Sequence, residues 1–361
     1  MNYRLTTLAI LFVIITDLAA GQPVTEKRTF RKGVRVNREM TLEVTNKYGT
    51  IHILPSSNDS LNITAEIEAS GQNHEKIRKM LEGINVSITE GNYSIIARTE
   101  FTQSINMIFE EFKGLTKKFI QYDSRVQINY SISAPSYLNM RIENKYGDVY
   151  MEDCSGSLSL TLSNGSFKAG TLQKLHDLNM SFCDATITGV DDASIDADFS
   201  EVSVGDAASL KINSISSKFE LRHAGKISTD SKRDKFYIGT LSSLKGESYF
   251  TDFRIEKLEG DLDISTKYGS LTADMVEKSF RGATINSGYS DITINFDPSI
   301  SYNLEIRHKN TTLYLPEKNA SLEKKTVSEE NGEFITFGSV GKAHGTVNVN
   351  IDANRGKIYI K

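Results

Sequence analysis

A short alternation of apolar and polar residues recurs through the middle of the chain. The segment NKYGT at 46–50 returns as NKYGD at 144–148 and as TKYGS at 266–270. We number each copy from the glycine of YG as position zero. Equivalent positions then follow at steps of 17 or 18 residues, with a last step of 21, at Gly147, Gly165, Cys183, Ser200, Ser217, Asp234, Thr251, Gly269 and Ser290. A fixed period of this kind indicates a structural repeat.

The positions two and four residues after zero are apolar in every repeat, and the residues between them are mostly polar. Position +2 holds Val149, Phe167, Ala185, Val202, Phe219, Phe236, Phe253, Leu271 and Ile292. Position +4 holds Met151, Ala169, Ile187, Val204, Leu221, Ile238, Ile255, Ala273 and Ile294. Alternation with a period of two predicts a strand with one buried face. Mostly apolar residues five positions before zero mark a second short strand.

One repeat is too small to bury a core, whereas stacked repeats share a continuous one. The pattern therefore predicts an all-β fold, a single-chain β-solenoid (β-helix) with 17–18-residue coils. Eight to nine coils at the usual strand spacing would be roughly 40 Å long. A β-propeller is the main alternative, because two repeats could imitate one four-stranded blade. The lack of a doubled period argues against it.

The two ends of the chain lack this regular repeat, and the change in pattern divides the chain into regions. We expect a signal peptide at 1–21, an N-terminal β-rich region with an α+β insertion or cap at 22–134, regular solenoid repeats at 135–295, and closing strands or a cap at 296–361. Within the last region, the patterns predict strands at 334–340 and 345–361 and a loop at 321–332.

Two segments of the N-terminal region have helical spacing. Asn73 is a suitable N-cap for a helix with the apolar residues Ile77, Met80, Leu81 and Ile84. The segment 101–121 is also amphipathic, with the apolar residues Ile105, Ile108, Phe109, Phe112, Leu115 and Phe119. It could contact a membrane surface or a partner. We favour a segment that covers the open end of the solenoid or packs within the N-terminal region, since an uncovered end exposes unpaired strand edges.

The first 22 residues have the pattern of an export signal. Arg4 precedes an apolar run at 5–15, and Ala19 and Gly21 suit cleavage before Gln22. A retained anchor helix is the alternative, but the run is shorter than the roughly 20 residues that a membrane span needs. No cysteine stands at the cleavage site. We therefore expect an exported protein of the periplasm or cell surface, not a lipoprotein, without a membrane span in the mature chain.

Charge and cysteine content exclude several classes of protein. The chain has 42 Lys+Arg and 46 Asp+Glu, a net charge of −4, and no long basic run, so nucleic acid is not an expected partner. Two cysteines exclude a disulfide scaffold and a four-cysteine zinc site. Cys154 and Cys183 fall two coils apart, about 10 Å, which is too far for a disulfide. We expect both thiols to be unpaired.

No group of residues forms a recognisable catalytic, cofactor or metal site. The six histidines are scattered, and the segment 338–342 lacks the first glycine and the final Ser/Thr of a phosphate loop. One acidic cluster could hold calcium through its carboxylate oxygens; it consists of Asp191, Asp192, Asp196, Asp198 and Glu201. It has no calcium-loop pattern, and the repeat points Asp196 and Asp198 into solvent. We expect no cofactor, no metal and no enzyme activity.

The position immediately before zero is rich in aromatic residues. It holds Tyr146, Asn164, Phe182, Phe199, Ser216, Arg233, Phe250, Tyr268 and Tyr289. Such a column either binds sugars or peptides along an edge of the solenoid or packs the corner of each coil. Tyr146, Tyr268 and Tyr289 are the candidate ligand contacts.

With the three YG motifs and the N-terminal signal, the chain resembles a family of bacterial putative adhesins. These are exported β-strand-repeat proteins catalogued as a domain of unknown function, akin to the head GIN adhesin domain. The resemblance covers roughly 27–361 and is strongest at 135–294, which opens with PSYLNMRIENKYGDV. It implies a β-solenoid and a cell-envelope location, and it brings no catalytic residues.

Two hypotheses about function remain open. The first is a non-enzymatic cell-envelope protein that binds a surface protein or glycan or serves as a scaffold. The second is a carbohydrate-active β-helix enzyme, a polysaccharide lyase or hydrolase. Such an enzyme needs acidic residues and a base grouped on one face of the coils. The outward positions of the repeats mix Ser, Thr, Lys, Arg, Asp and Tyr without such a group, so the first hypothesis is favoured.

Overall fold

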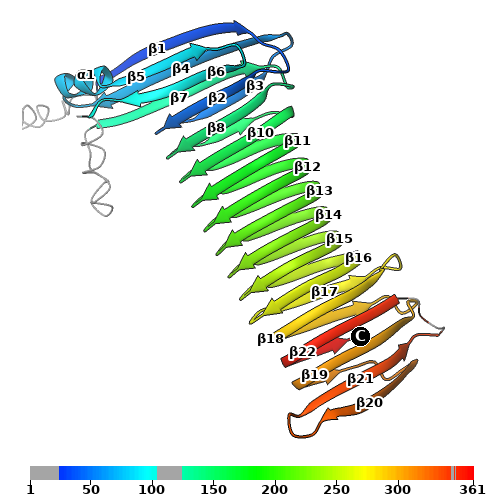
Figure 1. Ribbon diagram of the computed structural model, residues 1–361. Helices are drawn as coiled ribbons and strands as arrows, with labels where there is room; N and C mark the ends of the chain where they lie inside the picture. The colour runs from blue at the N-terminus through cyan, green and yellow to red at the C-terminus, as the bar shows by residue number, and fades with distance from the viewer. Residues whose placement is uncertain (1–23, 104–123, 343–344, 346) are drawn as a thin grey trace, which may run out of the picture.

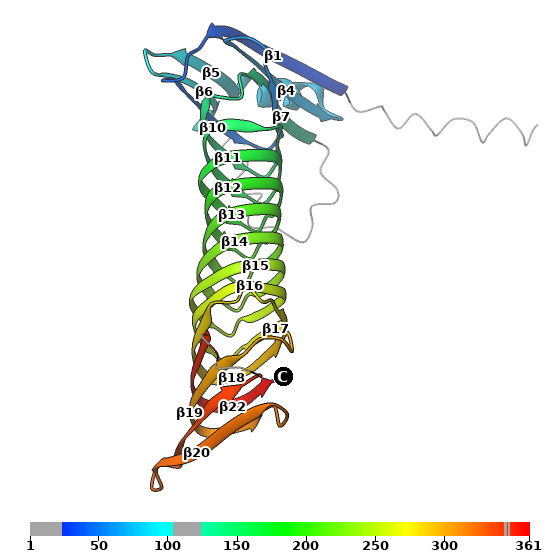
Figure 2. The ribbon, with the colours of Figure 1, turned by 90° about the vertical axis from the view of Figure 1, so that its right-hand side faces the viewer.

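The computed structural model describes residues 24–103, 124–342, 345 and 347–361. It is an elongated stack of strands with a broader cap at the N-terminal end (Figures 1 and 2). The predicted signal peptide and most of the segment 101–121 lie outside the described residues. Within the described ranges, no helix is long and apolar enough to cross a membrane.

The elements follow one another along the chain in three groups. The N-terminal group comprises β1 (Val24–Arg35), β2 (Thr41–Lys47), β3 (Ile51–Pro55), β4 (Ser60–Gly71), α1 (His74–Glu82), β5 (Ile84–Glu90), β6 (Ser94–Phe101) and β7 (Ser124–Ala134). The regular stack comprises β8 (Asn139–Lys145), β9 (Val149–Met151), β10 (Cys154–Ser163), β11 (Ser166–Ser181), β12 (Asp184–Asp198), β13 (Glu201–Ile215), β14 (Lys218–Lys232), β15 (Lys235–Tyr249), β16 (Asp252–Lys267), β17 (Ser270–Val276) and β18 (Gly282–Phe296). The C-terminal group comprises β19 (Tyr302–Tyr314), β20 (Ala320–Ser328), β21 (Glu333–Val340) and β22 (Val347–Ile360).

Most coils of the stack are one long strand that wraps around the core and pairs in parallel with the next coil (Figure 2). In β12 and β13, Ala185 faces Val202 and Ile187 faces Val204, and all four side chains are buried. The β-solenoid and its inward positions +2 and +4 are confirmed. Parallel pairing at constant register places equivalent residues of successive coils directly above one another.

Aromatic residues at position +2 form a stack inside the solenoid. The rings of Phe219 and Phe236 lie 4.6 Å apart between centroids, and those of Phe236 and Phe253 lie 4.8 Å apart. All three side chains are almost fully buried. Each coil thus buries the flat face of a ring against the next coil, in the offset geometry that aromatic pairs favour.

The first YG repeat joins the stack although 98 residues separate Gly49 from Gly147. Strand β2 pairs in parallel with β8, and β3 pairs with β9. The described residues of this insertion, together with β1, form the cap, in which β7 lies beside β3, β4 beside β7, and β1 beside β4. The long insertion therefore covers this end of the solenoid without interrupting its register.

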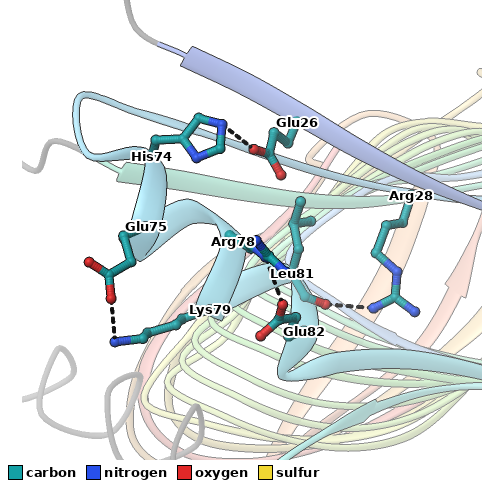
Figure 3. Close-up of polar contacts among 8 residues, drawn as sticks. All are labelled: Glu26, Arg28, His74, Glu75, Arg78, Lys79, Leu81 and Glu82. Carbon is teal, nitrogen blue, oxygen red and sulfur yellow. Dashed lines mark hydrogen bonds and ion pairs between the residues drawn. The ribbon is translucent and has the colours of Figure 1, made fainter.

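The predicted helix is confirmed as α1, although Ile84, expected on its apolar face, begins β5. Its N-cap Asn73 accepts a hydrogen bond from the backbone N–H of Lys76 at 3.0 Å, and its apolar face is buried. Arg28 of β1 donates to the carbonyl of Leu81 at 2.7 Å, near the helix C-terminus (Figure 3). His74 Nε2 lies 2.9 Å from a carboxylate oxygen of Glu26. These contacts tie α1 to β1.

The last strand of the chain does not lie at the end of the stack. β22 pairs in parallel with both β18 and β19, so Gly356 faces Ser290 on one side and Thr311 on the other. The chain reaches β22 through an antiparallel excursion in which β21 pairs with β19 and β20 with β21. The carboxyl-terminal residues thus add a coil inside the stack.

The prediction of a loop at 321–332 is wrong, because residues 320–328 form β20. This strand is exposed along most of its length and, among the described strands, pairs with β21 alone. Ala320 and Leu322 at its start are partly buried against the core, and backbone hydrogen bonds hold the rest. No alternation marks it in the sequence. Lys324 and Lys325 stand on this outermost strand, where charged residues discourage pairing with another chain.

Candidate functional site

The three candidate contact residues lie in one column at a corner of the coils. The structure brings Tyr268 and Tyr289 together, with their ring centroids 4.9 Å apart. Tyr146 lies several coils away and stacks on Tyr48 at 5.4 Å. We call the whole column the ridge; in stacking order it consists of Tyr48, Tyr146, Asn164, Phe182, Phe199, Ser216, Arg233, Phe250, Tyr268, Tyr289, Arg355 and Asn310.

Every residue of the ridge has a left-handed backbone, with φ between 50° and 66°. This conformation costs an L-amino acid other than Gly, Asn or Asp about 1–2 kcal/mol. Only Asn164 and Asn310 belong to the residue types that adopt it readily. Strained conformations of this kind persist where the surrounding structure fixes them, and they cluster at functional sites. Backbone preference therefore does not explain why most ridge positions hold residues other than Gly, Asn or Asp.

A ladder of hydrogen bonds at position zero fixes this corner. Ser200 Oγ accepts from the backbone N–H of Cys183 at 3.1 Å, and Ser217 Oγ accepts from the N–H of Ser200 at 3.2 Å. Asp234 Oδ1 accepts from the N–H of Ser217 at 2.6 Å. Each buried side chain thus satisfies a backbone donor of the preceding coil, which a solvent-excluded N–H requires. The ladder holds the adjacent ridge residues in place.

Asp234 is a buried carboxylate in this ladder. Its other oxygen, Oδ2, accepts from Ser214 Oγ at 2.8 Å and from the backbone N–H of Lys232 at 2.9 Å. Burial raises the pKa of Asp234 above its ordinary value, although these hydrogen bonds act in the opposite direction. No Lys or Arg of the described residues forms an ion pair with it.

Glycine occupies position zero where successive backbones approach most closely. A Cβ on Gly147 would overlap the carbonyl oxygen of Gly49, and a Cβ on Gly165 would overlap that of Gly147. The recurring YG motif therefore combines a left-handed aromatic residue with a close backbone contact. It is a structural motif of the corner.

The aromatic residues of the ridge form three separate runs. Within the described residues, the runs are Tyr48 with Tyr146, Phe182 with Phe199, and Phe250 with Tyr268 and Tyr289. The rings of Phe182 and Phe199 are nearly parallel, at 4° and a centroid distance of 5.1 Å. Neighbouring rings thus cover one another's faces, and the ridge presents ring edges along each run. Faces are open only at the ends of a run.

The third run ends on a cation. The guanidinium of Arg355 lies 4.9 Å from the ring centroid of Tyr289 and donates a hydrogen bond to its hydroxyl at 2.8 Å. A cation over a ring face is attracted by the electrons of the ring. This end of the run is therefore covered. At the opposite end, the ring of Tyr249 packs against that of Phe250 at 4.7 Å between centroids and 85° between planes.

A shallow groove of ≈ 590 Å³ lies on the outer face of β12 to β16, a few residues along each coil from the ridge. Gly205 and Gly239 line it together with Tyr237, Arg222 and Glu220. Glu220 is ion-paired with Lys218 at 2.7 Å. The groove combines an exposed ring with charges of both signs, and it shows no arrangement of a nucleophile beside a base.

The ion pairs near the groove are exposed. Asp206 accepts hydrogen bonds from His223 at 2.7 Å and Arg222 at 2.5 Å. These two partners, His223 first, hold the pKa of Asp206 below its ordinary value. Exposed pairs of this kind add little to stability.

The remaining sequence predictions concern thiols and metal ligands. Cys154 and Cys183 are both free and buried, as predicted. Burial raises the pKa of each thiol. Asp196 and Asp198 face outward, and Asp196 accepts a hydrogen bond from Asn213 at 2.8 Å. The described residues contain no group of His, Cys, Asp or Glu suited to a metal ion.

Sequence reasoning found the ridge column but missed its backbone conformation. The signal was present in Asn164-Gly165, since Asn is the side chain that most readily adopts a left-handed φ and Gly follows it as in YG. It also missed Tyr48 and Arg355 as members of the column. Their repeats are separated from the others by the cap and by β19 to β21.

No family model and no curated protein matches the chain. Among solved structures, it is similar to a "putative cell adhesion protein" from Clostridium sporogenes, with 14% identity, 93% of this chain and 99% of that chain covered, and a TM-score of 0.20. It is also similar to a "putative adhesin" from Bacteroides fragilis, with 9% identity, 92% and 97% coverage, and a TM-score of 0.26. A "putative adhesin" from Parabacteroides distasonis has 8% identity, 74% and 97% coverage, and a TM-score of 0.33. These likenesses are too distant to assign a family or a function.

Proposed function

We propose that this chain is a non-enzymatic β-solenoid of the cell envelope that binds surface saccharide chains through the ridge. The observation that carries the proposal is the conformation of the ridge residues. Aromatic side chains are held outward at left-handed positions where Gly or Asn would cost less free energy. Phe182 is 59% exposed and Phe199 is 54% exposed. Burial of these rings therefore offsets little of the cost of the left-handed backbone.

The spacing of the ridge favours a repeating ligand. Equivalent side chains recur at each coil, about 4.8 Å apart, which is comparable with the length of one sugar unit in an extended chain. Solenoids commonly use such extended surfaces for binding. Tyrosine rings combine apolar contact with a hydroxyl that can hydrogen-bond, and Tyr146 and Tyr289 are both exposed. A polymer with a regular period can thus meet the same contacts repeatedly.

The location is part of the same proposal. The N-terminal segment has the pattern of an export signal, which would bring the chain to the periplasm or the cell surface. A rigid stack that presents one long ridge suits an adhesin or a scaffold. We also retain the predicted boundaries of the regular repeats at residues 134 and 295; besides its capping strands, each flanking region contributes a coil to the stack.

A polysaccharide lyase or hydrolase is the competing function. The groove beside the ridge is the place where it would act, because Glu220 and Glu256 both line it. Glu220 is already ion-paired with Lys218 at 2.7 Å. Incubation with polysaccharides and assay for new reducing ends or unsaturated products distinguishes the two functions. Product formation would contradict the non-enzymatic proposal.

Binding to an array of bacterial and host glycans tests the proposal itself. The exported form is compared with a variant in which Tyr146, Tyr268 and Tyr289 are replaced by Asn. Asn suits the left-handed backbone, so the variant retains the corner while it loses three rings. The control is Tyr314→Thr, because Tyr314 is also exposed and stacks on Tyr359 at 4.4 Å but lies outside the ridge.

We expect the triple variant to lose most of its glycan signal and the control to keep it. Equal signals from the wild-type chain and the triple variant would remove the ridge from the binding site. Binding to a protein on intact cells without any glycan signal would replace the saccharide by a protein partner.

A further inference from the structure

The ridge is interrupted between its second and third aromatic runs. Ser216 and Arg233 occupy the two positions between Phe199 and Phe250. Three coil steps separate the two phenylalanines, which is about 14 Å at the usual strand spacing. Within the described residues, neither ring is stacked on another aromatic ring on the side of the interruption. We call this interval the notch.

Three of the cations that line the notch lack acidic partners. The side chains of Lys232, Arg233 and Lys235 form no hydrogen bond or ion pair with any described residue, and all three are exposed. This contrasts with Arg355, which occupies the same ridge position in another coil and is bound to Tyr289. Arg233 is therefore a guanidinium in a left-handed, outward position without a structural partner.

The charge of the notch is confined to two coils. At position +1, Glu201, Lys218, Lys235 and Asp252 face one another in successive coils. The lysines thus have an acidic residue on either side. A polymer with a negative charge on every unit would meet these carboxylates and be repelled. A ligand with one localised negative charge fits the notch.

The same coil leads from the notch to the groove. Arg233, Lys235 and Tyr237 occupy alternate outward positions, and Tyr237 is 44% exposed at the edge of the groove. Gly239 lines the groove beside it. A short chain could therefore anchor a charged unit in the notch and continue across Tyr237.

We propose that the notch binds a carboxylate-bearing sugar unit of an otherwise neutral saccharide chain, with Arg233 contacting the carboxylate between the open faces of Phe199 and Phe250. This inference rests on the proposed function and names the substrate class. Arginine pairs with a planar carboxylate through two parallel hydrogen bonds. The flanking rings provide apolar faces of the kind that pack against the flat side of a sugar.

The test uses oligosaccharides in matched pairs, each containing one uronic acid or the same sugar after reduction of its carboxyl group. Binding to the full exported chain is measured for the wild type, Arg233→Asn and Arg141→Gln. Asn suits the left-handed backbone at Arg233, and Arg141 is an exposed arginine of β8 outside the ridge, so each variant removes one exposed guanidinium. We expect the wild type to prefer uronate members at least tenfold, as one charge-assisted interaction allows. We expect R233N to lose that preference and R141Q to keep it.

Four results would overturn the inference. Equal binding of acidic and reduced members, or equal loss of preference in both arginine variants, would exclude a carboxylate site at Arg233 while leaving saccharide binding by the ridge intact. Tighter binding of a single-stranded oligonucleotide or a polyglutamate peptide, measured in parallel, would exclude a sugar-specific site. Failure of every oligosaccharide to bind would contradict both this site and the proposed function.

Discussion

The carboxylate of Asp234 accepts a hydrogen bond from the backbone N–H of Ser217, its counterpart one coil earlier, at 2.6 Å. In neighbouring coils a hydroxyl accepts the equivalent hydrogen bond; Ser200 Oγ, for example, accepts from the N–H of Cys183. One coil thus places an ionisable group where the others place a neutral one. The solenoid tolerates this substitution because three donors surround the carboxylate.

The pH dependence of stability should report this buried group. Because its folded pKa is raised by burial, Asp234 contributes stability that is fully present below the ordinary value of 3.8 and is lost as the pH rises through the folded pKa. Asp234→Asn removes that contribution. We expect the free energy of unfolding of the wild type, relative to D234N, to increase as the pH is lowered from 7 towards 4.

Urea unfolding of both proteins across this pH range measures the difference. Asp234→Thr is a useful companion, since Thr251 occupies the same position in the next coil. A difference between wild type and D234N that stays constant, or that grows with rising pH, would show that burial does not dominate the titration of Asp234.

Replacement of Phe199 should separate backbone strain from packing. Phe199→Asn relieves part of the left-handed strain, whereas Phe199→Ala does not. We expect F199N to be the more stable by about 0.5–1 kcal/mol. Thermal unfolding compares the two variants. If F199A equals or exceeds F199N in stability, the left-handed conformation is not a source of strain.

The equivalent experiment inside the solenoid should give a much larger effect. Phe236 is stacked between Phe219 and Phe253 and is buried. Phe236→Ala should cost about 3–5 kcal/mol, since a cavity remains in the core. Urea unfolding measures this loss. A cost below 1 kcal/mol would contradict the continuous interior stack.

Gly147 should not tolerate a side chain. Its Cβ would overlap the carbonyl oxygen of Gly49, so Gly147→Ala must separate two coils at the corner. We expect a loss of about 1–3 kcal/mol, typical of overpacking. Gly91→Ala is the matched control, because its nearest neighbour, Ser94 O, would be 3.5 Å from the new Cβ. Similar melting temperatures for G147A and G91A would refute the close approach.

The parts of this molecule that can be predicted from the sequence are those whose pattern of apolar and polar residues repeats from coil to coil. Val202 and Val204 repeat the inward pattern of Ala185 and Ile187, so register and fold class could be predicted by comparing coils. β20 could not, because beyond Ala320 and Leu322 it has little apolar contact and is held by backbone pairing with β21. The place of β22 could not either, since a strand that pairs with β18 after a long excursion leaves no local signal.

The sequence predicts the ridge as a column of residues, but it does not predict the left-handed backbone of that column. Tyr268 and Tyr289 could be aligned by counting from YG, whereas their left-handed backbone depends on the ladder formed with adjacent coils. The notch was also hidden. Ser216 and Arg233 look like gaps in an aromatic pattern, and only the stacked rings of Phe182 and Phe199 show that ring faces are open there.

The dissociation constant of a ridge variant for the saccharide bound most tightly by the wild type tests the central claim most directly. Phe199→Asn with Phe250→Asn removes both rings that border the notch and leaves residues suited to the left-handed backbone. The account predicts binding at least tenfold weaker, about 1.4 kcal/mol, with a melting temperature no lower than that of the wild type. An unchanged dissociation constant together with a lowered melting temperature would contradict it, because the rings would then serve the corner of the coil.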